Sequence, residues 1–174
     1  GHTYPGATMP FGMMQLSPDT RLEGWDGCSG YHYSDAYIYG FSHTHLSGTG
    51  VSDYGDILLM PTNAINFHNG ADGKKGYRAH FSHKNEEASP GYYHVKLDST
   101  DIEVELTVSK RSGIHKYQFP TSDNQIVILD LQHRDKVLDA TIEKISNTQL
   151  QGYRFSDAWA KDQRLYFYIK TSHA

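Results

Sequence analysis

The stretch from Gly40 to Asp56 gathers the side chains of this sequence that are best suited to chemistry. His43 and His45 stand two positions apart, so on a strand their imidazoles point to the same face. Two imidazoles placed in this way can bind one metal ion, which makes a zinc-dependent hydrolase one interpretation of the pair. In the other interpretation, both rings hydrogen-bond to neighbouring loops or to a ligand. A zinc site would take further ligands from histidines that follow no pattern: His32, His68, His80, His83, His94 and His133.

The same stretch mixes hydroxyl and carboxylate side chains with glycines. Glycine lets two backbones approach closely, and serine, threonine and aspartate supply directed hydrogen bonds. A strand that only filled a core would carry apolar residues at these positions. We therefore expect a polar wall of a site, or an interface to another domain. The candidate residues for this wall are His43, His45, Ser47, Thr49 and Asp53.

Trp25 lies between Gly24 and Asp26, a setting that favours an exposed platform. Sugar rings stack their C–H faces on aromatic rings, and a neighbouring carboxylate accepts hydrogen bonds from their hydroxyls. Trp25 and Asp26 are therefore candidate substrate-binding residues. The alternative is a tryptophan that closes one end of the core. Cys28 is the only cysteine, and we expect it to be a small buried residue.

The triplet His133-Arg134-Asp135 follows an apolar run that ends at Leu131. The same triplet occurs in the catalytic loop of protein kinases, but no glycine-rich phosphate loop accompanies it here, which excludes that class. Polar residues after a core strand can reach a site at the rim of a sheet, so His133, Arg134 and Asp135 are candidate substrate-binding residues. The alternative for Arg134 and Asp135 is a structural ion pair.

Length and composition restrict the class of protein. A chain of 174 residues has the size of one domain with a proper core. Its 13 tyrosines and 16 glycines fit an aromatic, turn-rich β protein. The net charge of −4 gives no electrostatic footprint for nucleic acid, and no apolar run of about 18 residues predicts a membrane span. A single cysteine excludes an internal disulfide and a cysteine-based zinc site.

Alternation of apolar and polar residues predicts strands along the whole chain. From Ile102 to Val108 every second residue is apolar, which is typical of a half-buried strand. The continuous run from Ile126 to Leu129 predicts a strand covered on both faces, and the run from Leu165 to Ile169 is similar. Only residues 134–140 have a pattern compatible with a short helix. Further strands are predicted at Gly76 to His83, Tyr92 to Leu97, Ile114 to Phe119, Thr141 to Ser146 and Leu150 to Phe155. The short intervals between them indicate an all-β fold, a large antiparallel β-sandwich with long ordered loops.

Several segments together resemble glycoside hydrolase family 92. The resemblance covers nearly the entire chain, and the stretch from Ser42 to Asp56 is long enough to be specific. The other matching segments are Tyr4-Pro5-Gly6-Ala7, Pro10-Phe11-Gly12, Ser17-Pro18-Asp19, Gly24-Trp25-Asp26, Cys28-Ser29-Gly30-Tyr31, His133-Arg134-Asp135, Gly152-Tyr153-Arg154 and Trp159-Ala160-Lys161-Asp162-Gln163.

The resemblance implies a function and a domain organisation. Members of this family are calcium-dependent, exo-acting α-mannosidases that invert the anomeric centre, and they are common in bacteria that degrade N-glycans and mannan. They pair an N-terminal, supersandwich-like β-sandwich with a larger C-terminal (α/α)6 barrel. We therefore expect residues 1–174 to be the N-terminal domain, without its first strand and without the barrel. The expected substrates are mannose-containing glycans, with an α-1,2 linkage.

In this family the catalytic carboxylates and the calcium ligands belong to the barrel. The resemblance therefore implies no catalytic residue and no metal ligand on this chain, and the isolated fragment is expected to be inactive. The sandwich contributes one wall of the −1 sugar pocket, a role that maps to Trp25. The family also implies a periplasmic, secreted or cell-surface location in a bacterium. The alternative function is a stand-alone carbohydrate-binding module.

Overall fold

The computed structural model describes residues 1–121 and 124–173, and within them the regular structure consists of thirteen β-strands and no helix. The all-β prediction is confirmed. No helix in this part of the chain is long and apolar enough to cross a membrane. The strands are β1 (Ala7–Thr8), β2 (Gln15–Asp19), β3 (Tyr37–Ile38), β4 (Gly40–Ser42), β5 (Leu58–Thr62), β6 (Ala79–Ser89), β7 (Tyr92–Leu97), β8 (Ile102–Val108), β9 (Gly113–Gln118), β10 (Ile126–Asp130), β11 (Lys136–Ser146), β12 (Gln149–Asp157) and β13 (Gln163–Lys170).

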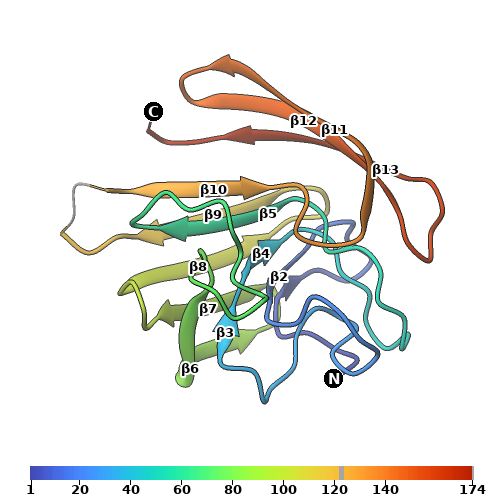
Figure 1. The fold of residues 1–174 in the computed structure, drawn as a ribbon, viewed down its shortest axis with the longest axis horizontal. Helices are drawn as coiled ribbons and strands as arrows, with labels where there is room; N and C mark the ends of the chain where they lie inside the picture. The colour runs from blue at the N-terminus through green and yellow to red at the C-terminus, as the bar shows by residue number, and fades with distance from the viewer. Residues whose placement is uncertain (122–123, 174) are drawn as a thin grey trace.

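The strands form three antiparallel sheets. One sheet has the order β1-β2-β4-β5-β10, a second has the order β3-β6-β7-β8-β9, and β11, β12 and β13 form a third. In Figure 1 the third sheet forms a separate upper layer, beyond β10. The sandwich expected from the sequence is thus formed by the two five-stranded sheets.

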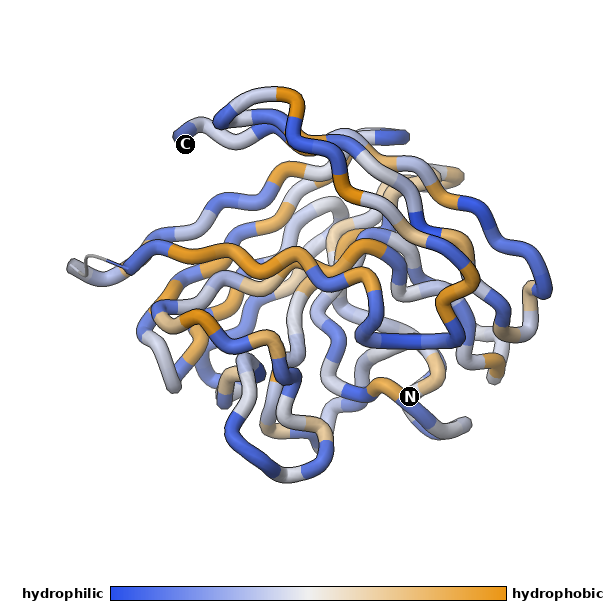
Figure 2. The backbone as a smooth tube through the Cα atoms, turned by 45° about the horizontal axis from the view of Figure 1, so that its top comes forward, coloured by the Kyte–Doolittle hydropathy of each residue, from blue (hydrophilic) through white to orange (hydrophobic). Residues whose placement is uncertain are grey.

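The hydrophobic core lies between these two five-stranded sheets. The strand β8 shows why, because Ile102, Val104 and Leu106 are buried while the glutamates between them are only partly covered. This alternation places one face of the strand on the core and the other in water. In Figure 2 the apolar stretches run through the middle of the molecule, and many of the outer loops are hydrophilic. Phe41 of β4 and Tyr93 of β7 meet across the core, with ring centroids 6.4 Å apart.

Two local predictions are wrong. Residues 134–140, considered as a helix, form the β10–β11 turn (residues 131–135) and the first part of β11, where Lys136 pairs with Asp157 of β12. Hydrogen bonding to β12 thus outweighs the local preference of these residues for a helix. The strand β10 is covered on one face only, since Ile128 is 6% exposed and Val127 is 44% exposed. β10 is the edge strand of its sheet, and its outward face stays partly open.

The strand β13 also differs from the prediction. Its residues alternate between partly buried and exposed, and Tyr166 and Tyr168 are exposed. The ring of Tyr166 lies beside Tyr153 and Phe155 of β12, with centroids 5.9 and 5.6 Å apart. The outer face of the third sheet therefore carries aromatic residues. In the sequence, a strand with such an exposed aromatic face looks the same as a strand that is covered on both faces.

Candidate functional site

Four connections between strands meet through direct contacts. They are the β2–β3 loop (residues 20–36), the β4–β5 loop (residues 43–57), the β10–β11 turn and the β12–β13 loop (residues 158–162). In Figure 1 the β4–β5 loop and the β12–β13 loop lie on the same side of the molecule as the loops near the N-terminus. Together these connections bring most of the candidate residues into one region.

Asp19 is the centre of a buried charged cluster beneath these loops. Its Oδ1 lies 2.9 Å from Nε2 of His45 and 3.9 Å from Nη1 of Arg134, and its Oδ2 lies 3.7 Å from Nε2 of His133. All four side chains are almost completely buried. Burial alone would raise the pKa of Asp19, but the charge and hydrogen bond of His45 and the charges of His133 and Arg134 together hold it below the usual value. Asp19 is therefore a carboxylate in the folded protein.

Both ring nitrogens of His45 have partners within the protein. Nδ1 lies 2.8 Å from the backbone oxygen of Gln15, and Nε2 lies 2.9 Å from Oδ1 of Asp19. The hydroxyl of Ser42 also lies 3.1 Å from Nε2. The ring is thus held between the backbone of β2 and a buried carboxylate, and both of its nitrogens are occupied by protein partners.

His43 points to the opposite sheet. Its Nδ1 donates to the backbone oxygen of Ile57 at 2.5 Å, so its Nε2 accepts from Nε2 of His115 at 2.9 Å. Nδ1 of His115 accepts in turn from the hydroxyl of Tyr117 at 2.8 Å. Burial lowers the pKa of His43 to about 4 and that of His115 well below its usual value, which agrees with two neutral rings.

His43 and His45 therefore do not direct their rings at a common ligand. Within the described residues, no three His, Cys, Asp or Glu side chains are grouped so that they could hold a metal ion. The zinc-hydrolase interpretation gains no support from this geometry. Ser47 and Thr49 lie at the exposed tip of the β4–β5 loop, where the hydroxyl of Thr49 donates weakly to the backbone of Val51 at 3.4 Å.

Arg134 lies under two of the loops. Its Nη2 donates to the backbone oxygen of Cys28 at 3.2 Å and to Oγ of Ser52 at 2.6 Å. Gly30 and Gly55, both with positive φ, allow this close approach. A Cβ at Gly30 would lie 3.1 Å from Nη1 of Arg134, and a Cβ at Gly55 would lie 2.9 Å from its Cδ. Glycine is required at both positions, since a side chain would displace the guanidinium.

Arg154, which sequence analysis did not select as a site residue, connects the third sheet to this region. It is fully buried, and its Nη1 lies 2.5 Å from Oδ1 of Asp56. Its Nε donates to the backbone oxygen of Leu131 at 2.8 Å, and its Nη2 donates to the backbone oxygen of Arg134. Asp56 also accepts from Oγ1 of Thr44 at 2.8 Å. In the sequence, the only sign that Arg154 is buried and paired was its position as a single arginine in the middle of a strand pattern.

Trp25 is exposed at the surface of the β2–β3 loop. The side chain is 68% exposed, and the edge of its ring meets His2 with centroids 4.3 Å apart. A Cβ at Gly50 would lie 3.2 Å from the indole nitrogen, so the tip of the β4–β5 loop passes directly beside the tryptophan. Asp26 is also exposed, with a carboxylate oxygen 3.2 Å from Nε2 of His32. The exposed platform expected at Trp25 is present, whereas Cys28 in the same loop is buried, as expected.

Two further aspartates border this region. Asp135 has a φ of +59°, which is strained for a residue with a side chain, and its Oδ2 has no hydrogen-bond partner. Partial burial raises the pKa of Asp135 to about 6, against the opposing effect of Arg134. Asp53 is buried and accepts a hydrogen bond from the backbone nitrogen of Ala160 at 3.0 Å. Asp53 thus joins the β4–β5 loop to the β12–β13 loop.

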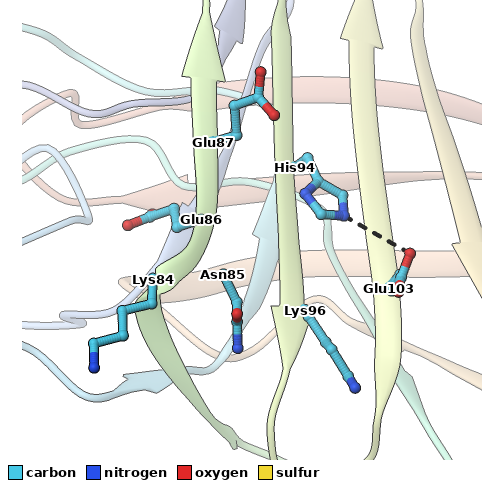
Figure 3. A pocket seen from close by; sticks show the side chains of 7 residues that line it. All are labelled: Lys84, Asn85, Glu86, Glu87, His94, Lys96 and Glu103. Carbon is cyan, nitrogen blue, oxygen red and sulfur yellow. Dashed lines mark ion pairs between the residues drawn. The ribbon is translucent and has the colours of Figure 1, made fainter.

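A shallow hollow of about 470 Å³ lies elsewhere, on the outer side of β6, β7 and β8. Figure 3 shows its charged lining, in which Nε2 of His94 lies 3.9 Å from a carboxylate oxygen of Glu103. Lys96 pairs with Asp101 at 2.8 Å. The lining residues are Lys84, Asn85, Glu86, Glu87, His94, Lys96 and Glu103, and none of them belongs to the four connections described above.

The family model for the N-terminal domain of glycosyl hydrolase family 92 matches residues 1–174. The chain belongs to this family. A family GH92 α-mannosidase from Bacteroides thetaiotaomicron, which has also been solved in complex with mannoimidazole, is 36% identical with a TM-score of 0.89. The match covers 97% of this chain and 23% of that protein. The GH92 family glycosyl hydrolase ccman5 is 29% identical with a TM-score of 0.81, over 97% of this chain and 24% of its own length.

One curated relative matches over a shorter stretch. An uncharacterized secreted glycosidase from Arthroderma benhamiae is 28% identical over 145 residues, which is 75% of this chain and 18% of the relative. This family-92 domain therefore spans less than a quarter of the length of each of these proteins. The supersandwich-like fold expected from the resemblance agrees with the close superposition on the two solved glycosidases.

Proposed function

We propose that this domain belongs to an exo-acting, inverting α-mannosidase and supplies one wall of the −1 sugar pocket. The observation that carries the proposal is Trp25, an exposed ring on a loop that is fixed from beneath by Arg134. Membership of family 92 and the likeness to a solved α-mannosidase support the substrate class. The proposed substrates are N-glycans or mannan with terminal α-1,2-linked mannose, and the proposed location is the periplasm or the cell exterior of a bacterium.

In this proposal Trp25 stacks on the apolar face of the mannose ring, and carboxylates accept its hydroxyls. Asp26 is exposed beside the ring, and Asp135 has an unpartnered oxygen at the border of the region. Asp26 suits direct contact with a sugar, whereas Oδ2 of Asp135 is buried, so only the exposed part of the Asp135 side chain can meet one. His133 and Arg134 are buried, so their part in substrate binding is to support the loops from below. His45 and Asp53 complete that support, and His43 joins the β4–β5 loop to β9 through His115. The exposed Ser47 and Thr49 belong to the interface with the barrel.

The chemical step requires groups that we place in the C-terminal (α/α)6 barrel. An inverting glycosidase needs a general acid at the leaving oxygen and a base that activates water, with carboxyl groups about 6.5–9.5 Å apart. Calcium, with its many oxygen ligands and flexible geometry, would bind sugar hydroxyls when present. The described residues of this domain do not form a suitable ligand group, so we assign no step of the reaction to calcium here. The domain orients the mannose and excludes water from one side of it.

The proposal is tested by kinetics of a Trp25→Ala variant of the full-length enzyme on an α-1,2-mannobiose. Loss of a stacking wall should raise KM by about tenfold or more while kcat changes less, because the contact forms before the transition state. Phe67→Ala is the matched control, since Phe67 is equally aromatic and 83% exposed on another loop. Equal kinetics for Trp25→Ala and Phe67→Ala would refute a sugar-binding role for Trp25.

A further inference from the structure

Two arginines form a continuous connection from the third sheet to the loop that carries Trp25. Arg154 is on β12, and Arg134 is in the β10–β11 turn. Nη2 of Arg154 donates to the backbone oxygen of Arg134, so the first arginine holds the backbone from which the second extends. Both side chains are buried, at 0% and 4% exposure for the whole residue.

Arg154 fixes the turn at two points and the β4–β5 loop at a third. It donates to the backbone oxygens of Leu131 and Arg134, which lie at the start and near the end of the turn. Its ion pair with Asp56 holds the end of the β4–β5 loop. The planar guanidinium can satisfy three acceptors in fixed directions, which a lysine ammonium on a flexible stem does less well.

Arg134 then holds two loops with one nitrogen. Its Nη2 bonds the backbone of Cys28, three residues after Trp25, and the side chain of Ser52, two residues after Gly50. Gly50 is the residue that passes beside the indole of Trp25. The β2–β3 and β4–β5 loops therefore meet twice: at the surface, where Gly50 lies beside Trp25, and beneath it, where Arg134 bonds to Cys28 and Ser52.

We propose that Arg134 and Arg154 act in series as positioning residues, which fix the β2–β3 loop against the β4–β5 loop and so set the orientation of Trp25. The expected effect on KM rests on the proposed function, whereas the expected effect on the orientation of Trp25 does not. The guanidinium of Arg134 lies beneath the loops and acts on a sugar only through Trp25. The third sheet thereby takes part in shaping the pocket through the buried side chain of Arg154.

The kinetic test is a double-mutant cycle in the full-length enzyme, with Arg134→Lys and Trp25→Ala alone and combined. Arg134→Lys keeps the charge and removes the fork, and should raise KM by about tenfold with little change in kcat. If Arg134 acts through Trp25, the double variant should lie within about twofold of Trp25→Ala alone, because coupled residues are not additive. Arg154→Lys should also raise KM. Arg111→Lys, at an exposed position between β8 and β9, is the matched control.

A second measurement reports the orientation directly. With 5-fluorotryptophan incorporated into the full-length protein, the ¹⁹F resonance of Trp25 is assigned by its absence in Trp25→Phe. Arg134→Lys and Arg154→Lys should shift or broaden this resonance, whereas Arg111→Lys should leave it in place. This readout is independent of activity, and the remaining tryptophan resonances show whether each variant is folded.

The outcomes separate the two claims. An unmoved Trp25 resonance in folded Arg134→Lys, or effects of Arg134→Lys and Trp25→Ala on KM that multiply, would overturn the positioning role. A shifted resonance together with an unchanged KM for Trp25→Ala would support the positioning role and overturn the proposed sugar contact. A shifted resonance with a non-multiplying effect on KM supports both.

Discussion

Asp135 combines a strained backbone with a partly buried carboxyl group, and this combination affects stability. Its φ of +59° is more readily adopted by glycine or asparagine, and its pKa of about 6 lies above the ordinary value of 3.8. The folded protein thus binds this proton more tightly than the unfolded chain does. The carboxyl causes no loss of stability below about pH 4, and the loss grows between about pH 4 and pH 6 and is constant at higher pH.

Replacing Asp135 by asparagine should therefore stabilise the protein in a pH-dependent way. We expect a gain of about 1 kcal/mol at pH 8, because the group is only partly buried, and a smaller gain at pH 4 that reflects the backbone alone. Urea unfolding of the unmodified protein and of Asp135→Asn at pH 4 and pH 8 measures the change in unfolding free energy. An Asp135→Asn variant that gains no more stability at pH 8 than at pH 4 would show that the carboxyl is not perturbed. A rise in KM in the same variant is expected if Asp135 accepts a sugar hydroxyl.

At the scale of elements, Arg154 is the main polar connection between the third sheet and the rest of the domain. Arg154→Ala would leave the buried Asp56 without its cationic partner, which should cost about 3–5 kcal/mol of unfolding free energy. Arg164→Ala is the matched control on the neighbouring strand, because the Arg164–Asp162 pair is exposed and should contribute little to the unfolding free energy. Unfolding by urea compares the two variants. Similar losses for both would contradict the role given to Arg154.

The elements that the sequence predicts well are those whose partners lie nearby in the chain. The strand from Ile102 to Val108 and the strand from Tyr92 to Leu97 have the predicted bounds, because alternation directly reports a half-buried strand. Residues 134–140 were misassigned since their structure depends on Arg154 and on pairing with β12, which the local pattern does not contain. Val127 was misassigned because an apolar side chain on an open face looks the same as one in a core.

The residues of the candidate site also divide into those that could be predicted from nearby sequence and those that could not. Trp25 was recognisable from its neighbours, because glycine and aspartate around a tryptophan favour exposure. The roles of His43 and His45 depended on partners far away in sequence, His115 for one and Asp19 for the other. Two histidines at positions i and i+2 predict a shared face, but here both residues lie beyond the end of β4, where the strand geometry no longer holds.

At the scale of the whole molecule, the proposed function makes this domain one half of an active site. The pure 174-residue chain is therefore expected to release no mannose from α-mannosides and to bind them very weakly, because it presents a single wall. A sensitive assay for free mannose and calorimetric titration measure the two quantities, and circular dichroism confirms the β structure of the sample. Turnover would overturn the division of labour between domains. Micromolar affinity without turnover would favour a stand-alone carbohydrate-binding module.

In the proposed function, Trp25 forms a wall of the mannose pocket. The most direct measurement is a crystal structure of the full-length protein with bound mannoimidazole. We expect the inhibitor ring to lie on the indole of Trp25 within van der Waals distance, at about 3.5–4.0 Å. The Cys28–Arg134–Ser52 contacts should be intact beneath it. An inhibitor bound away from Trp25, with the indole packed into the interface between domains, would contradict the account.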